Sequence, residues 1–255
     1  MIKYNNSDIN EWFFAQDNIV KAYYNNAVCY LKVGSEYVPP TPPTPSYTQY
    51  EYIKSEAKKI YEFNTNFHPT TANTIEIKME MNDTSVDWGR IICWANCAGD
   101  SCDASQFRFN TVTGSYAVIA RKGNTSGITY RIVGKDIPIV VNMPLSASTY
   151  TVSGGTNVSV NYNSASDWAS YLPSSTPMYI WSLGPSTVTD SATRRSACCK
   201  IFYIKIYDAN GDLVKHYVPS DYNGTPCFYE IVGGDYIINT YSGTDAGTCT
   251  LGPVV

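Results

Sequence analysis

Three cysteines in the middle of the chain have the kind of close spacing that can bind a metal ion. Cys93, Cys97 and Cys102 are separated by gaps of three and four residues, and thiolates are preferred ligands of Zn²⁺. The gaps differ from those of zinc knuckles, and neither of the two histidines, His68 and His216, lies in a ligand-like array. Because a buried free cysteine behaves as a small hydrophobic side chain, we expect no metal site and no cofactor.

Two carboxylates and an ammonium alternate with apolar residues in segment 74–81. Glu76, Lys78 and Glu80 are therefore predicted to share one solvated face of a strand. A retaining glycosidase needs two carboxyl groups about 5–5.5 Å apart, whereas residues four apart on a strand are separated by about 13 Å. Motifs of serine hydrolases, phosphate-binding loops and metalloproteases are absent from the sequence, so we expect no catalytic residues and no enzyme activity.

Two tryptophans are candidate contacts for a glycan. Trp88 and Trp168 each follow an aspartate in turn-like sequence, which favours exposure, and an exposed aromatic ring can stack on a sugar. Trp181, in an apolar run, is expected in the core. Segment 208–212 (Asp-Ala-Asn-Gly-Asp) is similar to the start of a calcium loop but lacks the acidic ligand that closes an EF-hand loop. Its Asn-Gly pair instead predicts a hairpin turn.

Composition excludes several broad classes of protein. The chain has 255 residues, a formal net charge of −4 and no long basic run, which disfavours electrostatic binding to nucleic acid. No apolar stretch approaches the roughly 20 residues of a membrane span, and the first residues lack the apolar segment of a secretory signal. Eight cysteines in such a chain indicate free thiols made in a reducing compartment.

A proline-rich run divides the chain. Residues 39–45 include five prolines, which favour polyproline II and make a semi-rigid spacer. At about 3.1 Å per residue, this spacer would hold its flanks roughly 25 Å apart. We therefore predict an N-terminal assembly segment at residues 1–37, a linker at 38–46 and a β-sandwich at 47–255.

The N-terminal segment is predicted to form a small β-hairpin. Apolar runs at 19–24 and 27–32 flank Asn25-Asn26, and asparagine tolerates the positive φ of a type I′ turn. A lone hairpin is marginally stable in water, so its aromatic side chains either fold back on the body or dock on a partner. The rigid spacer favours docking. The anchoring residues that we predict are Trp12, Phe13, Phe14, Tyr23 and Tyr30.

The body is predicted to be all-β. Short apolar or alternating runs recur between turns rich in Asn, Gly and Ser, a pattern typical of a β-sandwich. Adjacent Cys198 and Cys199 are expected to point to opposite faces of a strand. Segment 55–60 has a helix-friendly composition but is short. The predicted strands include 74–81, 128–133, 137–141, 178–181, 200–207 and 236–238.

The last third of the chain carries a resemblance to a known family. Residues 205–219 (Lys-Ile-Tyr-Asp-Ala-Asn-Gly-Asp-Leu-Val-Lys-His-Tyr-Val-Pro) are similar to a recurring segment of concanavalin A-like (laminin-G-like) domains. These domains occur in virion proteins of gut bacteriophages of the Bacteroides-type, crAss-like group. Segment 227–239 resembles the stretch that follows it there. Residues 50–65 and 178–181 resemble the family's opening and one of its middle strands, so the resemblance covers approximately residues 47–245.

The resemblance implies a structural surface protein of a tailed bacteriophage, a head fibre or a capsid decoration. It implies a concanavalin A-like, jelly-roll β-sandwich on the virion surface, made in the host cytoplasm. Residues 1–37 would bind the capsid or another virion protein, and the free hairpin edge favours a dimer or trimer. Residues 20–30 also resemble hairpins that precede linkers in those proteins, with Asn25-Asn26 where glycine is frequent, and Lys215 stands where arginine is usual. The alternative is a tail-fibre or free lectin for host surface glycans.

Overall fold

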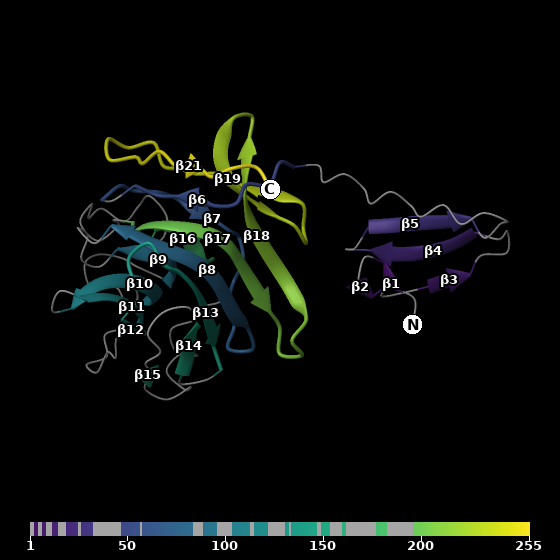
Figure 1. Cartoon of the computed structure of the whole chain (residues 1–255), viewed down its shortest axis with the longest axis horizontal. Coiled ribbons are helices and arrows are strands. Elements are labelled where there is room, and N and C mark those ends of the chain that lie inside the picture. Colours follow the sequence, from purple (N-terminus) through teal and green to yellow (C-terminus); the bar gives the residue numbers. More distant parts are fainter. Residues whose placement is uncertain are drawn as a thin grey trace. The chain divides into compact units, whose positions relative to one another are not determined.

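A computed structural model shows the chain as two compact units, Met1–Ser46 and Tyr47–Val255 (Figure 1). The backbone is described for residues 3–4, 7–8, 12–14, 19–24, 27–32, 47–56, 58–83, 89–95, 104–112, 115–121, 131–132, 134–146, 149–153, 160–161, 177–182 and 196–255. Side chains are described within residues 47–56, 58–82, 89–94, 134–146, 150–153, 177–182 and 196–255.

The N-terminal unit consists of two small antiparallel sheets. Strands β1 (Lys3–Tyr4) and β2 (Ser7–Asp8) form one of them. The other has the order β3-β4-β5 and comprises β3 (Trp12–Phe14), β4 (Ile19–Tyr24) and β5 (Ala27–Lys32). The pairing of Tyr24 with Ala27 leaves a two-residue loop, which confirms the predicted hairpin. The strand that contains Trp12 extends this hairpin to three strands.

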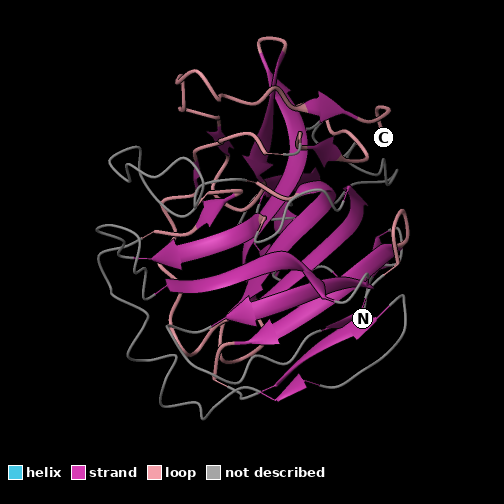
Figure 2. Cartoon of the chain, turned by 90° about the vertical axis from the view of Figure 1, so that its left-hand side faces the viewer, coloured by secondary structure: helices cyan, strands magenta, loops and turns pink. Residues whose placement is uncertain are grey.

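The second unit is a β-sandwich built from a six-stranded and a ten-stranded antiparallel sheet (Figure 2). The six-stranded sheet has the order β12-β11-β10-β9-β16-β7. Its strands are β7 (Phe63–Asn64), β9 (Arg90–Ala95), β10 (Ala104–Val112), β11 (Ser115–Arg121), β12 (Arg131–Ile132) and β16 (Tyr179–Ile180).

The ten-stranded sheet has the order β15-β14-β13-β8-β17-β18-β19-β20, with β6 paired to β17 and to β21. Its strands are β6 (Ile53–Lys54), β8 (Thr74–Asp83), β13 (Pro138–Pro144), β14 (Thr149–Ser153), β15 (Val160–Asn161), β17 (Cys198–Tyr207), β18 (Leu213–Tyr222), β19 (Thr225–Glu230), β20 (Asp235–Ile237) and β21 (Thr250–Leu251). The all-β prediction is thus confirmed, and the residues that the structure describes include no helix, membrane-spanning or otherwise.

The core lies between the two sheets because each contributes its apolar face. On β8, the period-two alternation buries Ile75, Ile77 and Met79. Aromatic side chains fill the space opposite: Trp181 lies 5.7 Å from Phe63 of β7 and 5.7 Å from Phe228 of β19, centroid to centroid. Trp181 is fully buried, as predicted, and its ring joins the two sheets.

The turn between β17 and β18 is the predicted hairpin. The Asp208 carboxylate accepts hydrogen bonds from the backbone N–H groups of Asn210 (2.8 Å) and Asp212 (3.0 Å), which organises the loop locally. Gly211 follows with a φ of 86°, a left-handed conformation that glycine adopts without steric cost. The long strands on either side are therefore joined by a turn that the local sequence encodes.

One local expectation was wrong, and one segment of ambiguous sequence is decided by tertiary contacts. Cys198 and Cys199 are both buried, because a register shift between them interrupts the alternation of β17. The helix-friendly segment 55–60 is not helical where it is described. Lys58 has a left-handed φ of 63°, and Ser55 donates to a backbone carbonyl of the neighbouring strand, so tertiary contacts override the weak local propensity.

Candidate functional site

The predicted contact residues fall on parts of the chain whose side chains the structure does not describe. Trp88 and Trp168 lie outside the described residues. Trp12, Phe13 and Phe14 form β3. Tyr23 lies on β4, which pairs with β3, and Tyr30 lies on β5, which pairs with β4. The structure describes the backbone of these five N-terminal residues. The anchoring role of the five residues and the glycan contacts of the two tryptophans remain predictions.

The carboxylates of β8 are engaged by neighbouring side chains. Glu80 lies 2.8 Å from the ammonium of Lys200 and accepts a 2.7 Å hydrogen bond from Asn82, while the Lys78 ammonium lies 5.1 Å above the Phe202 ring. Glu80 is 7% exposed, so the expectation of a solvated face is wrong at this residue. Within the described side chains there is also no cluster of three or more metal ligands.

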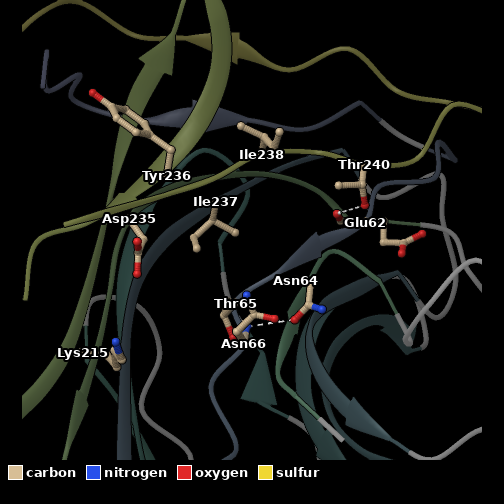
Figure 3. A pocket seen from close by; sticks show the side chains of 10 residues that line it. All are labelled: Glu62, Asn64, Thr65, Asn66, Lys215, Asp235, Tyr236, Ile237, Ile238 and Thr240. Atoms are coloured by element: carbon tan, nitrogen blue, oxygen red, sulfur yellow. Dashed lines mark hydrogen bonds between the residues drawn. The ribbon is translucent and has the colours of Figure 1, made fainter. Parts of the chain in front are cut away.

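A polar pocket of about 460 Å³ lies at one edge of the sandwich (Figure 3). This volume falls in the range of small-molecule sites, roughly 300–1,000 Å³. Strand β7 ends the six-stranded sheet and β20 ends the ten-stranded sheet, so the pocket lies where the two edge strands meet. Its lining residues are Glu62, Asn64, Thr65, Asn66, Lys215, Asp235, Tyr236, Ile237, Ile238 and Thr240.

Contacts between residues 62–63 and 239–240 bring the two edges together. Phe63 forms an isolated antiparallel bridge with Asn239, and the Asn239 side-chain oxygen accepts a 2.8 Å hydrogen bond from the Glu62 N–H. The backbone N–H and the hydroxyl of Thr240 both donate to the Glu62 carbonyl, at 3.2 and 3.1 Å. These bonds join the sheets directly beside the pocket.

The wall that follows β7 is held by its own side chains. The Asn64 side-chain oxygen accepts a 2.9 Å hydrogen bond from the Asn66 N–H, and Asn66 has a φ of 53°, a conformation that asparagine tolerates. The Thr65 hydroxyl donates to the Met178 carbonyl at 2.7 Å. The Thr65 hydroxyl therefore stabilises the fold by bonding to a neighbouring segment. The Asn64 amide group and the exposed Asn66 side chain border the pocket.

Opposite this wall, the ammonium of Lys215 is paired with Glu230 at 2.8 Å. The Glu230 carboxylate also accepts hydrogen bonds from the backbone N–H groups of His216, Val232 and Gly233. Burial by itself would raise the pKa of Glu230, but these donors and the ammonium hold its pKa below the ordinary value. Lys215, the one cation among the described lining residues, is thus already paired with a carboxylate.

Asp235 differs from Glu230 in its surroundings. It is exposed, and its carboxylate takes part in none of the hydrogen bonds or ion pairs found among the described residues. In Figure 3, Asp235 and Lys215 lie on one side of the pocket and Asn64, Thr65 and Asn66 on the other. The arrangement offers hydrogen-bond donors and acceptors from two walls.

A cluster of tyrosines lies on the other side of β20. Tyr236 points away from Asp235 and Ile237 (Figure 3), as strand alternation requires. Its ring is 4.9 Å from Tyr229 and 4.9 Å from Tyr222, and Tyr229 stacks on Tyr47 at 4.0 Å. Tyr222 is 47% exposed. The tyrosine cluster, defined by Tyr47, Tyr222, Tyr229 and Tyr236, gives this end of the sheet a partly accessible aromatic surface.

The pocket residues were missed at the sequence level because no motif marks them. Most of them lie in segments 62–66 and 235–240, around β7 and β20, and these segments are far apart in the sequence. The available signals were the turn-rich composition of Gly233-Gly234 and of Asn64 to Asn66. Such signals indicate loops but do not show that two loops lie together.

Comparison with known proteins finds distant structural likeness alone. No protein-family model matches the chain, and no curated protein matches it. The full-length tailspike protein 2 of Escherichia coli O157:H7 bacteriophage CAB120 is similar with a TM-score of 0.40 and 7% identity, over 66% of this chain and 27% of the tailspike. The chain thus spans about a quarter of the tailspike's length.

A second solved structure, Scytalido-glutamic peptidase with a peptide-based transition-state analogue, has a TM-score of 0.31 and 12% identity. The match covers 83% of this chain and 100% of the peptidase. Both TM-scores are too low to carry an argument about function. The proposals below therefore rest on the residues of this chain.

Proposed function

We propose that this chain is a structural surface protein of a tailed bacteriophage, a head fibre or capsid decoration. Residues 1–37 anchor it to the capsid or another virion protein, and the sandwich is displayed on the virion surface. The observation that carries the proposal is the division of the chain at Ser46 and Tyr47, directly after the proline-rich run, between a small unit of short strands and a sandwich with its own core.

The positions of the family-like segments support this proposal. Residues 205–219 form most of the β17–β18 hairpin, and residues 227–239 contain the end of β19 and all of β20. These strands are neighbours in the ten-stranded sheet. These two segments, which resemble parts of gut-phage virion domains, thus lie on neighbouring strands of one sheet.

The experiment compares particles assembled with the full chain and with a chain that lacks residues 1–37. We expect the full chain to be found in purified particles at capsid vertices or capsomer centres by cryo-electron microscopy, and the shortened chain to remain in the supernatant. Light scattering of the purified full chain then gives its oligomeric state in solution, for which we expect a dimer or a trimer. Incorporation of the shortened chain would refute the anchor, and density at the tail would refute the capsid location.

A second candidate function, binding of host surface glycans, is favoured by the polar pocket between β7 and β20. It is compatible with display on a virion, where many copies combine weak contacts into firm attachment. Binding of the full chain on a glycan array tests it, and the Trp88→Ala and Trp168→Ala variants test whether the two predicted tryptophans contribute. Absence of binding to any glycan would leave a purely structural role.

A further inference from the structure

We infer that the pocket between β7 and β20 binds a neutral, hydroxyl-rich saccharide and rejects acidic polysaccharides. This inference rests on the proposed glycan-binding function and specifies its site and ligand class. It follows from the charge of the lining, from the polar groups that are left available, and from the size of the pocket.

The charge of the lining disfavours an anionic ligand. Asp235 contributes an exposed carboxylate, and the ammonium among the described lining residues, that of Lys215, lies 2.8 Å from Glu230. A uronate or sulfate group in the pocket would therefore face the Asp235 carboxylate, while the Lys215 ammonium is already paired with Glu230. Like charges placed together at a binding surface act against that partner.

The available polar groups suit sugar hydroxyls. Asp235 is exposed, and each of its two carboxylate oxygens can accept hydrogen bonds from a ligand. The Asn64 side-chain oxygen is already used by the Asn66 N–H at 2.9 Å, which leaves its amide NH₂ group as a donor. Thr240 donates its hydroxyl proton to the Glu62 carbonyl at 3.1 Å, so its oxygen remains an acceptor. A sugar with adjacent hydroxyls can donate to the carboxylate and accept from the amide.

The size and polarity of the pocket point to the same class of ligand. A volume of about 460 Å³ is open to a small saccharide, while most small-molecule sites of this size are lined mainly by apolar side chains. Here Ile237 and Ile238 are the two aliphatic side chains among ten lining residues. An apolar ligand would therefore gain little by leaving water, whereas a hydroxylated ligand finds partners on both walls.

Affinity electrophoresis of the full chain tests this inference. The protein is run in native gels that contain dextran, mannan or xyloglucan as neutral polymers, or alginate or hyaluronan as acidic ones. We expect retardation in at least one neutral gel and none in the acidic gels. Asp235→Asn should weaken the retained interaction about tenfold or more, because it removes a charge-assisted acceptor. Asp235→Lys should abolish neutral binding and allow retardation by alginate.

Asp212→Asn is the matched control, because Asp212 is also exposed but lies in the β17–β18 turn and does not line the pocket. It should bind like the original chain. Neutral binding that survives Asp235→Lys would overturn the assignment to this pocket. Retardation of the original chain in acidic gels alone would overturn the inferred ligand class but leave glycan binding in place. No retardation in any gel, together with no binding on the glycan array, would refute the ligand class and the glycan-binding function. Particle incorporation, measured separately, reports on the virion proposal.

Discussion

The Lys215 ammonium lies 2.8 Å from the Oε2 atom of Glu230, whose side chain is 2% exposed. Glu230 also accepts backbone N–H groups from His216 and from Val232 and Gly233. One buried carboxylate therefore joins β18 to the turn that leads into β20. Asp235 is the first residue of β20 and directly follows this turn, so the ion pair also positions one wall of the candidate site.

Replacing Glu230 should be costly for stability. Glu230→Ala leaves a partly buried ammonium and several backbone donors without their acceptor, and we expect the free energy of unfolding to fall by about 3–5 kcal/mol. Urea denaturation followed by circular dichroism measures this loss, with Glu51→Ala, an exposed glutamate, as the control. A loss no larger than that of the control would contradict this role of the ion pair.

Acid should destabilise the sandwich in two overlapping steps. Burial, followed by the nearby Lys205 charge, lowers the pKa of His216 from 6.5 to about 4. The unfolded chain therefore takes up this proton before the folded chain does, and stability falls as the pH drops from about 6.5 towards 4. The pKa of Glu230 is also lowered, so its contribution is present above the ordinary carboxyl range and is lost as the pH falls through its folded value.

Urea titrations at pH 7, 6, 5 and 4 measure this dependence. His216 packs against Tyr203, at 6.1 Å between ring centroids, and we expect His216→Gln to flatten the curve between about pH 6.5 and 5. The decline at lower pH should remain because Glu230 is still present. An unchanged slope in the variant would show that His216 does not titrate as its burial requires.

Trp181 should be among the most costly core residues to truncate. Its ring packs on Tyr61 at 5.4 Å, on Phe63 and Phe228, and its indole N–H lies 3.2 Å from the Cys199 sulfur. Burial raises the pKa of the Cys199 thiol to about 12, so this sulfur accepts the N–H as a neutral thiol. We expect Trp181→Ala to cost about 3–5 kcal/mol in the free energy of unfolding.

Chemical denaturation checks this value, and near-ultraviolet circular dichroism reports whether the remaining rings keep their packing. Trp181→Phe retains an aromatic ring and should lose less than Trp181→Ala. Equal losses for the two variants would mean that filling the space between the sheets does not depend on ring volume.

The sandwich should fold without the N-terminal unit. Residues 47–255 contain both sheets and the whole described core, as an independently folding domain does. We expect the isolated fragment to melt within about 3 °C of the main transition of the full chain, since shifts above that size correspond to about 1 kcal/mol for a domain of this length. Calorimetry tests this, and aggregation of the fragment would show that the boundary at Tyr47 is misplaced.

Local sequence patterns anticipated several elements of this fold. The alternation of Ile75, Ile77 and Met79 with charged residues placed β8 and its buried face, and Asp208 to Asp212 placed the β17–β18 turn. These features depend on neighbours within a few residues, so the sequence carries them directly. The two buried cysteines at the start of β17 were misjudged because a register shift depends on the partner strand, which the local pattern does not contain.

The sequence by itself determined the all-β class, the proline-marked division of the chain and the hairpins, because period-two alternation and turn chemistry are local properties. The tertiary structure alone decided which strands end the two sheets. The resulting strand order places Asn64 of β7 and Asp235 of β20 on opposite walls of one pocket, and it leaves the Asp235 side chain exposed. Strand order arises from packing of the whole core, so residues this far apart in the sequence become a site only after both sheets have closed over it.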